Sequence, residues 1–157
     1  MDPHQRLLMG FYSSDEAGLI EEPGFCEGRF SVLVEQARYW RTLTLVHGAA
    51  TDEVTDVQVR RLADVSFDVR STSGLTVRDR PIRIESLEFE TDVSAWVASG
   101  KVSAPDGLVT DSAGHLRVTG LPRGDYRWMI LDANGVATEG EVTLAPWVET
   151  PVTVLID

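Results

Sequence analysis

Residues 111–126 read Asp-Ser-Ala-Gly-His-Leu-Arg-Val-Thr-Gly-Leu-Pro-Arg-Gly-Asp-Tyr, and this stretch decides the fold. It combines a glycine-containing turn, a strand with alternating apolar and polar residues, and a second turn that leads into another strand. Pro122 fixes φ for the second turn, and Gly124 supplies backbone freedom. Tyr126 can bury its ring while its hydroxyl bonds to the backbone just upstream, as in the tyrosine corner of β-sandwiches. The stretch therefore predicts two strands joined at a sandwich corner.

The same alternation of apolar and polar residues runs through most of the chain. It is found at residues 30–34, 43–45, 57–59, 65–69, 82–84, 116–118, 126–130, 142–144 and 152–156. Turn sequences separate these runs, at residues 72–74, 105–107, 111–114 and 132–135. No stretch shows a sustained helical period. Many short strands with frequent turns predict an all-β fold, an antiparallel β-sandwich.

The chain also contains an internal repeat. Residues 15–34 align without gaps on residues 111–130, with Asp, Ala and three Gly in matching positions and Phe30 in the place of Tyr126. We expect residues 61–157 to form one complete sandwich and residues 1–60 to be the C-terminal strands of a preceding unit. Such a half-sandwich exposes strand edges, so it must pack on the complete unit or on another chain. The alternative is that both halves use the same hairpin chemistry by chance.

The motif at residues 111–126 resembles the carboxypeptidase regulatory-like and Cna-B-like families of prealbumin-type β-sandwiches. The residues that carry the resemblance are Asp111, Gly114, Gly120, Leu121, Pro122, Gly124 and Tyr126. The resemblance covers residues 61–157 and implies an antiparallel β-sandwich of prealbumin or immunoglobulin-like type. It also implies an accessory module, stalk or spacer, located outside the cell or in the cell envelope.

Composition excludes several classes of function. The chain of 157 residues has 14 basic and 25 acidic side chains and a net charge of -11, which repels nucleic acid and anionic membranes. Cys26 is the only cysteine, so no internal disulfide can form, and the first residues fit neither a signal peptide nor a membrane span. The compartment stays open, because a fragment would lack its leader.

No set of residues predicts catalysis, a metal or a cofactor. The histidines, His4, His47 and His115, are scattered, and Cys26 has no base nearby in the sequence. Some Cna-B-like domains carry a Lys to Asn isopeptide bond, but Lys101 and Asn134 do not match the usual placement. The acidic residues near turns, Asp106, Asp111, Asp125 and Asp132, favour a solvated surface over a calcium site.

Two further motifs allow binding. Arg123-Gly124-Asp125 spells an integrin-binding tripeptide, yet it falls inside the corner motif, where structural reasons explain it. Trp96 and Trp147, with Trp40, could form a platform on which sugars stack, although tryptophan at strand ends more often closes a core. The sequence therefore predicts a non-catalytic structural, spacer or protein-interaction module of a multi-module chain, with protein partners or neighbouring repeats. The alternative is a carbohydrate-binding module that uses exposed Trp96 and Trp147.

Overall fold

The computed structural model describes residues 28–34, 39–48, 57, 59–132 and 134–157. The chain divides into two compact units, Met1–Ser31 with Leu45–Thr55 and Val32–Thr44 with Asp56–Asp157. Most of the first repeat copy, residues 15–27 with Cys26, lies outside the described residues, as does His4. The fold can therefore be argued mainly for the second unit.

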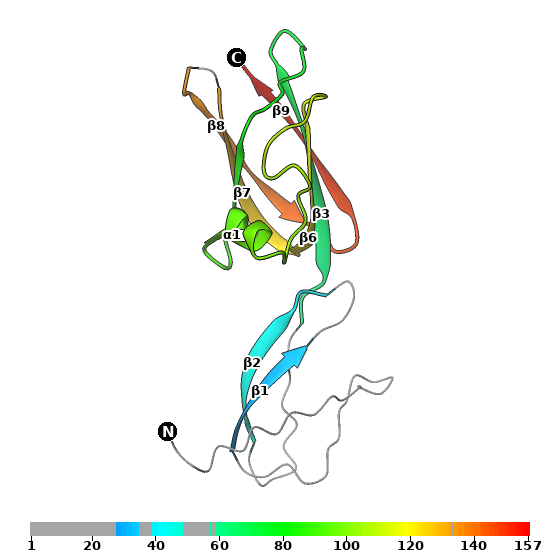
Figure 1. Cartoon of the computed structure of the whole chain (residues 1–157), viewed down its shortest axis with the longest axis vertical. Helices are drawn as coiled ribbons and strands as arrows, with labels where there is room; N and C mark the ends of the chain where they lie inside the picture. The colour runs from blue at the N-terminus through cyan, green and yellow to red at the C-terminus, as the bar shows by residue number, and fades with distance from the viewer. Residues whose placement is uncertain (1–27, 35–38, 49–56, 58, 133) are drawn as a thin grey trace. The chain divides into compact units, whose positions relative to one another are not determined.

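The second unit contains a β-sandwich, which confirms the predicted fold class (Figure 1). One sheet has the strand order β6-β3-β9 and the other has the order β5-β4-β7-β8. The strands are β3 (Leu62–Ser71), β4 (Ile82–Ser86), β5 (Thr91–Asp92), β6 (His115–Pro122), β7 (Gly124–Leu131), β8 (Ala137–Leu144) and β9 (Glu149–Ile156).

Alternating side chains from both sheets form one core, as the period of two requires. On β3 the residues Ala63, Val65, Phe67 and Val69 are buried, and the residues between them are only partly covered. The ring of Phe67 meets Trp128 of β7 edge-on, with ring centroids 6.0 Å apart. This contact joins the two sheets across the core.

One pair of strands departs from the antiparallel pattern. β3 pairs with β6 in antiparallel orientation, but it pairs with β9 in parallel orientation, in register from Asp64 with Glu149 to Ser71 with Ile156. The pairs β4–β5, β4–β7 and β7–β8 are antiparallel. Because β3 and β9 run the same way, β3 begins at one end of the sandwich and β9 finishes at the other. We call the end at which Leu62 lies proximal and the end at which Ile156 lies distal.

The predicted turns adopt the conformations that glycine favours. Gly74, Gly107, Gly114 and Gly135 all have φ between +74° and +83°, the left-handed region that other residues rarely adopt. All four predicted turn sequences therefore form turns in the structure.

The described part of the first sixty residues contains two strands, β1 (Gly28–Val34) and β2 (Thr42–Gly48), which form a two-stranded sheet. They include two of the predicted alternating runs. A third prediction is wrong, because Val57 and Val59 lie in no strand. Two alternating valines are too short a run to distinguish a strand from a half-buried connection.

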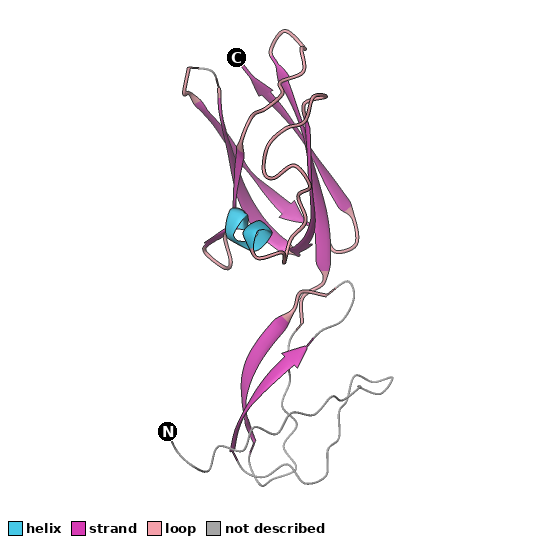
Figure 2. Cartoon of the chain, in the orientation of Figure 1, coloured by secondary structure: helices cyan, strands magenta, loops and turns pink. Residues whose placement is uncertain are grey.

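One short helix, α1 (Val93–Ala98), interrupts the strands at the proximal end (Figure 2). Asp92 caps it, since its carboxylate accepts a hydrogen bond from the amide of Ser94 at 2.9 Å. Six residues cannot establish a helical period in a sequence, which explains why none was predicted. Among the described residues, no helix is long and apolar enough to cross a membrane.

Candidate functional site

The corner between β6 and β7 is built around Tyr126. Its side chain is 1% exposed, and its hydroxyl donates a hydrogen bond of 2.6 Å to the carbonyl oxygen of Pro122. This is the upstream backbone bond that the tyrosine corner requires. Leu121 is fully buried, and Gly124 stands at φ +146°. The corner therefore fixes the angle at which the chain leaves one sheet for the other.

The phenol of Tyr126 is held in its neutral form. Burial raises its pKa well above the ordinary value, and a hydrogen bond with Ser86 only partly offsets this effect. Ser86 is itself buried, and its hydroxyl accepts a bond of 3.3 Å from the amide of Phe89. The phenol is therefore a structural donor at neutral pH.

Two more motif residues organise the turn before β6. One carboxylate oxygen of Asp111 accepts bonds of 2.8 Å from the amides of Ala113 and His115. These backbone bonds, the one from His115 first, lower the pKa of Asp111 below its usual value. Gly114 packs against the backbone, because a Cβ there would lie 2.7 Å from the carbonyl oxygen of Val69. The turn is thus fitted to the distal end of β3.

Gly120 marks an irregularity in the pairing of β6 with β3. It has φ +81°, and its amide donates to a carboxylate oxygen of Asp64 at 3.1 Å. The register of the two strands shifts at this place, between Ala63 and Val65. A bulge of this kind explains why the motif contains glycine here.

The structure corrects the proposed role of Trp96. Its side chain is only 8% exposed, and its ring packs against Trp40 at 4.9 Å and against Phe89 at 5.6 Å between centroids. The cause is α1, which places Val93 and Trp96 three residues apart on its buried face. Trp96 therefore belongs to the core and cannot serve as half of an exposed sugar platform.

Trp147 is exposed, as the carbohydrate hypothesis requires. Its side chain is 45% exposed, and its backbone adopts φ +66°, which is unusual for a bulky residue. The ring of Tyr39 meets it edge-on at 5.5 Å, and the guanidinium of Arg61 lies 5.7 Å from its centroid. Its amide donates to the carbonyl oxygen of Leu62 at 3.1 Å. These residues form an aromatic and cationic cluster at the proximal end.

A hollow of about 270 Å³ lies beside this cluster. Its walls come from residues 39–41, 62 and 99–101, so it combines Tyr39 and Trp40 with the cationic side chains of Arg41 and Lys101. The hollow is partly enclosed and partly open to solvent. Its chemistry can accept an anionic or aromatic group but offers no nucleophile and base in contact.

Ion pairs cross the outer face of the β6-β3-β9 sheet. The guanidinium of Arg117 on β6 lies 3.5 Å from the carboxylate of Asp64 on β3 and 2.9 Å from that of Glu149 on β9. The carboxylate of Asp68 on β3 lies 3.0 Å from the guanidinium of Arg70 on the same strand and 3.4 Å from the imidazole of His115 on β6. These pairs are solvent-exposed, so each stabilises the sheet only modestly.

The remaining motifs do not form sites in the described part of the chain. Asp125 of the tripeptide lies in β7 and accepts a bond of 2.6 Å from Thr143, while the amide of Arg123 bonds to Arg61, so the tripeptide is not at the tip of a projecting loop. Lys101 lies at the proximal end and Asn134 in the distal turn between β7 and β8, too far apart for an isopeptide bond.

Metal ligands do not gather either within the described residues. No three His, Cys, Asp or Glu side chains of that part of the chain are placed to hold an ion. Asp132 is buried for a structural reason, because it accepts bonds of 2.8 and 2.7 Å from the amides of Asn134 and Val136. Asp111 is likewise committed to its own turn.

The sequence matches no protein-family model and no curated protein. Among solved structures, the chain is similar to the minor pilin of Streptococcus agalactiae, with 17% identity and a TM-score of 0.48 over 92% of this chain and 66% of that one. It is similar to the TIE protein of Bacillus anthracis, with 8% identity and a TM-score of 0.45 over 82% of this chain and 23% of that one. A streptococcal ancillary pilin gives 16% identity and a TM-score of 0.43 over 83% and 45%. The chain thus spans between 23% and 66% of these chains, and with identities of at most 17% the likenesses assign it neither a family nor an activity.

Proposed function

We propose that this chain is a non-catalytic structural module of a longer, multi-module protein, in which the sandwich of residues 61–157 acts as a spacer. The observation that carries the proposal is the parallel pairing of β3 with β9. The chain enters the sandwich at Leu62 and leaves it at Ile156, at the opposite end. Modules on either side would therefore be held apart by the full length of the strands.

The separation follows from the register. Ile156 is paired with Ser71, nine residues along β3 from Leu62. At a rise of about 3.3 Å per residue, the two points are roughly 30 Å apart. Had β9 run antiparallel to β3, both connections would emerge at one end, and neighbouring modules would be brought together instead of spaced.

The proposal includes residues 1–60 as part of a preceding repeat and a location outside the cell or in the cell envelope. The repeat rests on the sequence match, and the location rests on the family resemblance. One contact crosses the proposed boundary at residue 61. Trp40 precedes this boundary, yet its ring packs on Trp96 in the sandwich core. Light scattering of residues 1–157 beside residues 61–157 tests this part. Equal stability of two monomers would make the first sixty residues dispensable, whereas loss of stability would assign them a role in the sandwich.

A distance measurement tests the spacer. Arg123→Cys and Asp157→Cys place spin labels at exposed positions, one at each end of the sandwich. Arg123 lies at the proximal end, because its amide donates to the carbonyl oxygen of Arg61 at 2.9 Å. Cys26→Ser removes the natural thiol. We expect pulsed electron paramagnetic resonance to give a narrow distribution of distances between the labels, centred around 30 Å after allowance for the length of the label side chains. A broad distribution, or one centred well below 20 Å, would contradict a rigid spacer.

Carbohydrate binding is the second candidate, and the exposed ring of Trp147 favours it. A stacked sugar would change tryptophan fluorescence, since aromatic faces are the usual platform for apolar sugar surfaces. The experiment titrates soluble cellohexaose and chitohexaose into the protein and into Trp147→Ala. A fluorescence response that disappears in the variant would support carbohydrate binding. If neither protein responds, the spacer is the candidate function that is left.

A further inference from the structure

The first and the last strand of the sandwich pair directly with each other, and this arrangement has a mechanical consequence. β3 is the first strand of the sandwich and β9 the last, and they lie side by side over eight residue pairs. A chain pulled from both directions would draw β3 toward the proximal end and β9 toward the distal end. The pull would act along the strands, so all hydrogen bonds between them would be loaded together.

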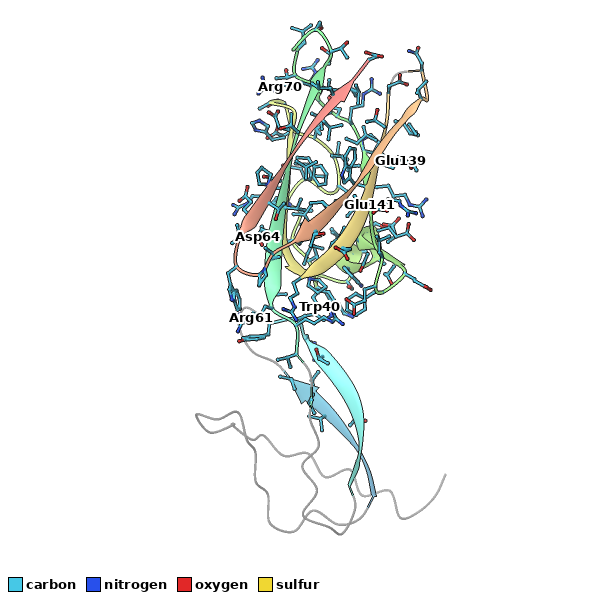
Figure 3. All side chains as sticks on the ribbon, turned by 180° about the vertical axis from the view of Figure 1, so that it is seen from behind. Trp40, Arg61, Asp64, Arg70, Glu139 and Glu141 are labelled. Carbon is cyan, nitrogen blue, oxygen red and sulfur yellow. The ribbon has the colours of Figure 1, made fainter. Side chains whose placement is uncertain are left out.

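The ladder extends beyond the paired residues at both ends. At the proximal end the amide of Trp147 donates to Leu62 at 3.1 Å, and at the distal end the amide of Thr72 donates to Ile156 at 3.0 Å. Figure 3 shows Arg61, Asp64 and Arg70 following β3 from the proximal toward the distal end. Bonding thus spans the whole length of both strands.

Side chains oppose sliding of one strand past the other. Val154 and Ile156 of β9 are 2% and 4% exposed and belong to the same core as Phe67 and Val69 of β3. Since side chains alternate between faces, β9 must slip by two residues before it can pair again with its inner face buried. That slip would pull Ile156 out of the core while the ladder bonds are broken.

The aromatic and cationic cluster at the proximal end adds contacts at the point where tension would enter β3. Arg61 directly precedes β3, and its guanidinium lies over the ring of Trp147, two residues before β9. On the outer face, Arg117 bridges Asp64 and Glu149, which belong to the two loaded strands. Each contact is individually modest, but all of them must break at the same time as the ladder.

We propose that the β3–β9 pair is a force-bearing clamp, which allows the sandwich to remain folded while tension passes along the chain. This inference deepens the proposed spacer function and rests on it only for the source of the tension. A spacer could have its ends apart and still yield easily. The clamp therefore makes a separate claim about the force at which the sandwich opens.

The direction of pulling provides the test, because it changes the loading without changing the fold. In the full chain with Cys26→Ser, tethers at the two chain ends load the clamp in shear. Tethers at Thr72→Cys and Asp157→Cys both lie at the distal end, so they peel β9 from β3 one bond at a time. Single-molecule force spectroscopy at one loading rate compares the two, and the sandwich is recognised in the end-to-end pull by a release of about 300 Å of chain.

We expect the end-to-end unfolding force to be several-fold higher than the peeling force, because many bonds share the load in only one geometry. Equal forces in the two geometries would overturn the clamp. They would leave the spacer intact, since the spacer depends on the 30 Å separation measured with labels. A short separation would overturn the spacer whatever the forces are.

A matched pair of proline variants locates the resistance. The amide of Asp64 donates to the carbonyl oxygen of Val148, and the amide of Thr72 donates to that of Ile156. In a parallel ladder, the residues of one strand whose carbonyl groups accept these bonds also donate their own amides to the other strand. The even-numbered residues of β9 are therefore the ones that donate to β3. Pro151 agrees with this alternation, since its missing N–H would face the open edge. Val152→Pro should therefore lower the end-to-end force strongly, and Thr153→Pro should leave it near the original value. A larger loss in Thr153→Pro would refute the assignment of the load to this ladder.

Discussion

Replacing Tyr126 with phenylalanine tests the corner on which the sandwich depends. The substitution removes one hydroxyl and keeps the ring in a site that is 1% exposed, so packing changes little. The lost bond to Pro122 is 2.6 Å long and buried. A hydrogen bond of this kind contributes about 1 kcal/mol net, and the cost rises toward about 2 kcal/mol if the carbonyl stays without another partner.

The assay is urea denaturation at pH 7, followed by tryptophan fluorescence. With a slope of about 2 kcal/mol/M, a loss of 1 to 2 kcal/mol lowers the midpoint by about 0.5 to 1 M. Tyr39→Phe is the matched control, because it removes the same hydroxyl group from a ring that lies against Trp147, outside the corner. We expect the control to stay within about 0.5 kcal/mol of the original protein, as surface substitutions usually do.

The raised pKa of Tyr126 predicts that the stability difference between the original protein and the Tyr126→Phe variant depends on pH. The folded protein keeps the phenol neutral, so its contribution is fully present below the unfolded pKa of about 10 and is lost as the pH rises above it. By pH 11 the unfolded chain gains about 1.4 kcal/mol from ionisation of this tyrosine, and the phenylalanine variant has no such term. The deficit of the variant should therefore shrink nearly to zero between pH 7 and pH 11. A deficit that is absent at pH 7, or that stays constant up to pH 11, would refute the reasoning.

Three further substitutions test the packing of single residues. Gly114→Ala and Gly74→Ala both place a side chain at a φ near +80°, but only the side chain at position 114 meets backbone, at 2.7 Å from the carbonyl oxygen of Val69. We expect Gly114→Ala to lower the free energy of unfolding by about 1 to 3 kcal/mol more than Gly74→Ala does. Equal losses in urea denaturation would show that the turn can move away from β3. Asp92→Ala removes the cap of α1 and should cost about 1 kcal/mol at pH 7. Partial burial opposes ionisation of Asp92, but hydrogen bonds from Ser94 and the charge of Arg83 lower its pKa; its contribution is therefore present above about pH 4 and lost as the pH falls below that value, and a difference that persists unchanged at pH 2 would contradict this role.

Several residues of the motif at 111–126 could be anticipated from the sequence because their requirements are local. A left-handed turn favours glycine, as at Gly114, and a buried phenol needs a nearby acceptor, as at Tyr126. Both requirements are met within a few residues of the chain. The bond between Asp64 and Gly120 could not be anticipated, because it joins residues 56 positions apart and depends on the register of two strands.

The two tryptophans show why the candidate binding residues were harder to predict. Trp96 and Trp147 have similar neighbours in the sequence, with valine following both. A helix of six residues turns Trp96 into the core, while a left-handed backbone at Trp147 leaves its ring in solvent. In each case a local backbone conformation decides the exposure. Composition and alternation do not encode either conformation.

The parallel direction of β9, on which the proposed function depends, has its origin earlier in the chain. β4 ends at the proximal end, and residues 87–114 then return the chain to the distal end while contributing only the short strand β5 and the helix α1. Two isolated bridges, Ser103 with Thr119 and Val109 with Pro81, hold this returning segment against the sandwich. β6, β7 and β8 then alternate in direction, so β9 starts at the proximal end and must run parallel to β3. A connection that stayed at the proximal end would have reversed all four strands and brought both ends of the sandwich together. The segment that looks least regular in the sequence is therefore the one that makes a spacer geometrically available.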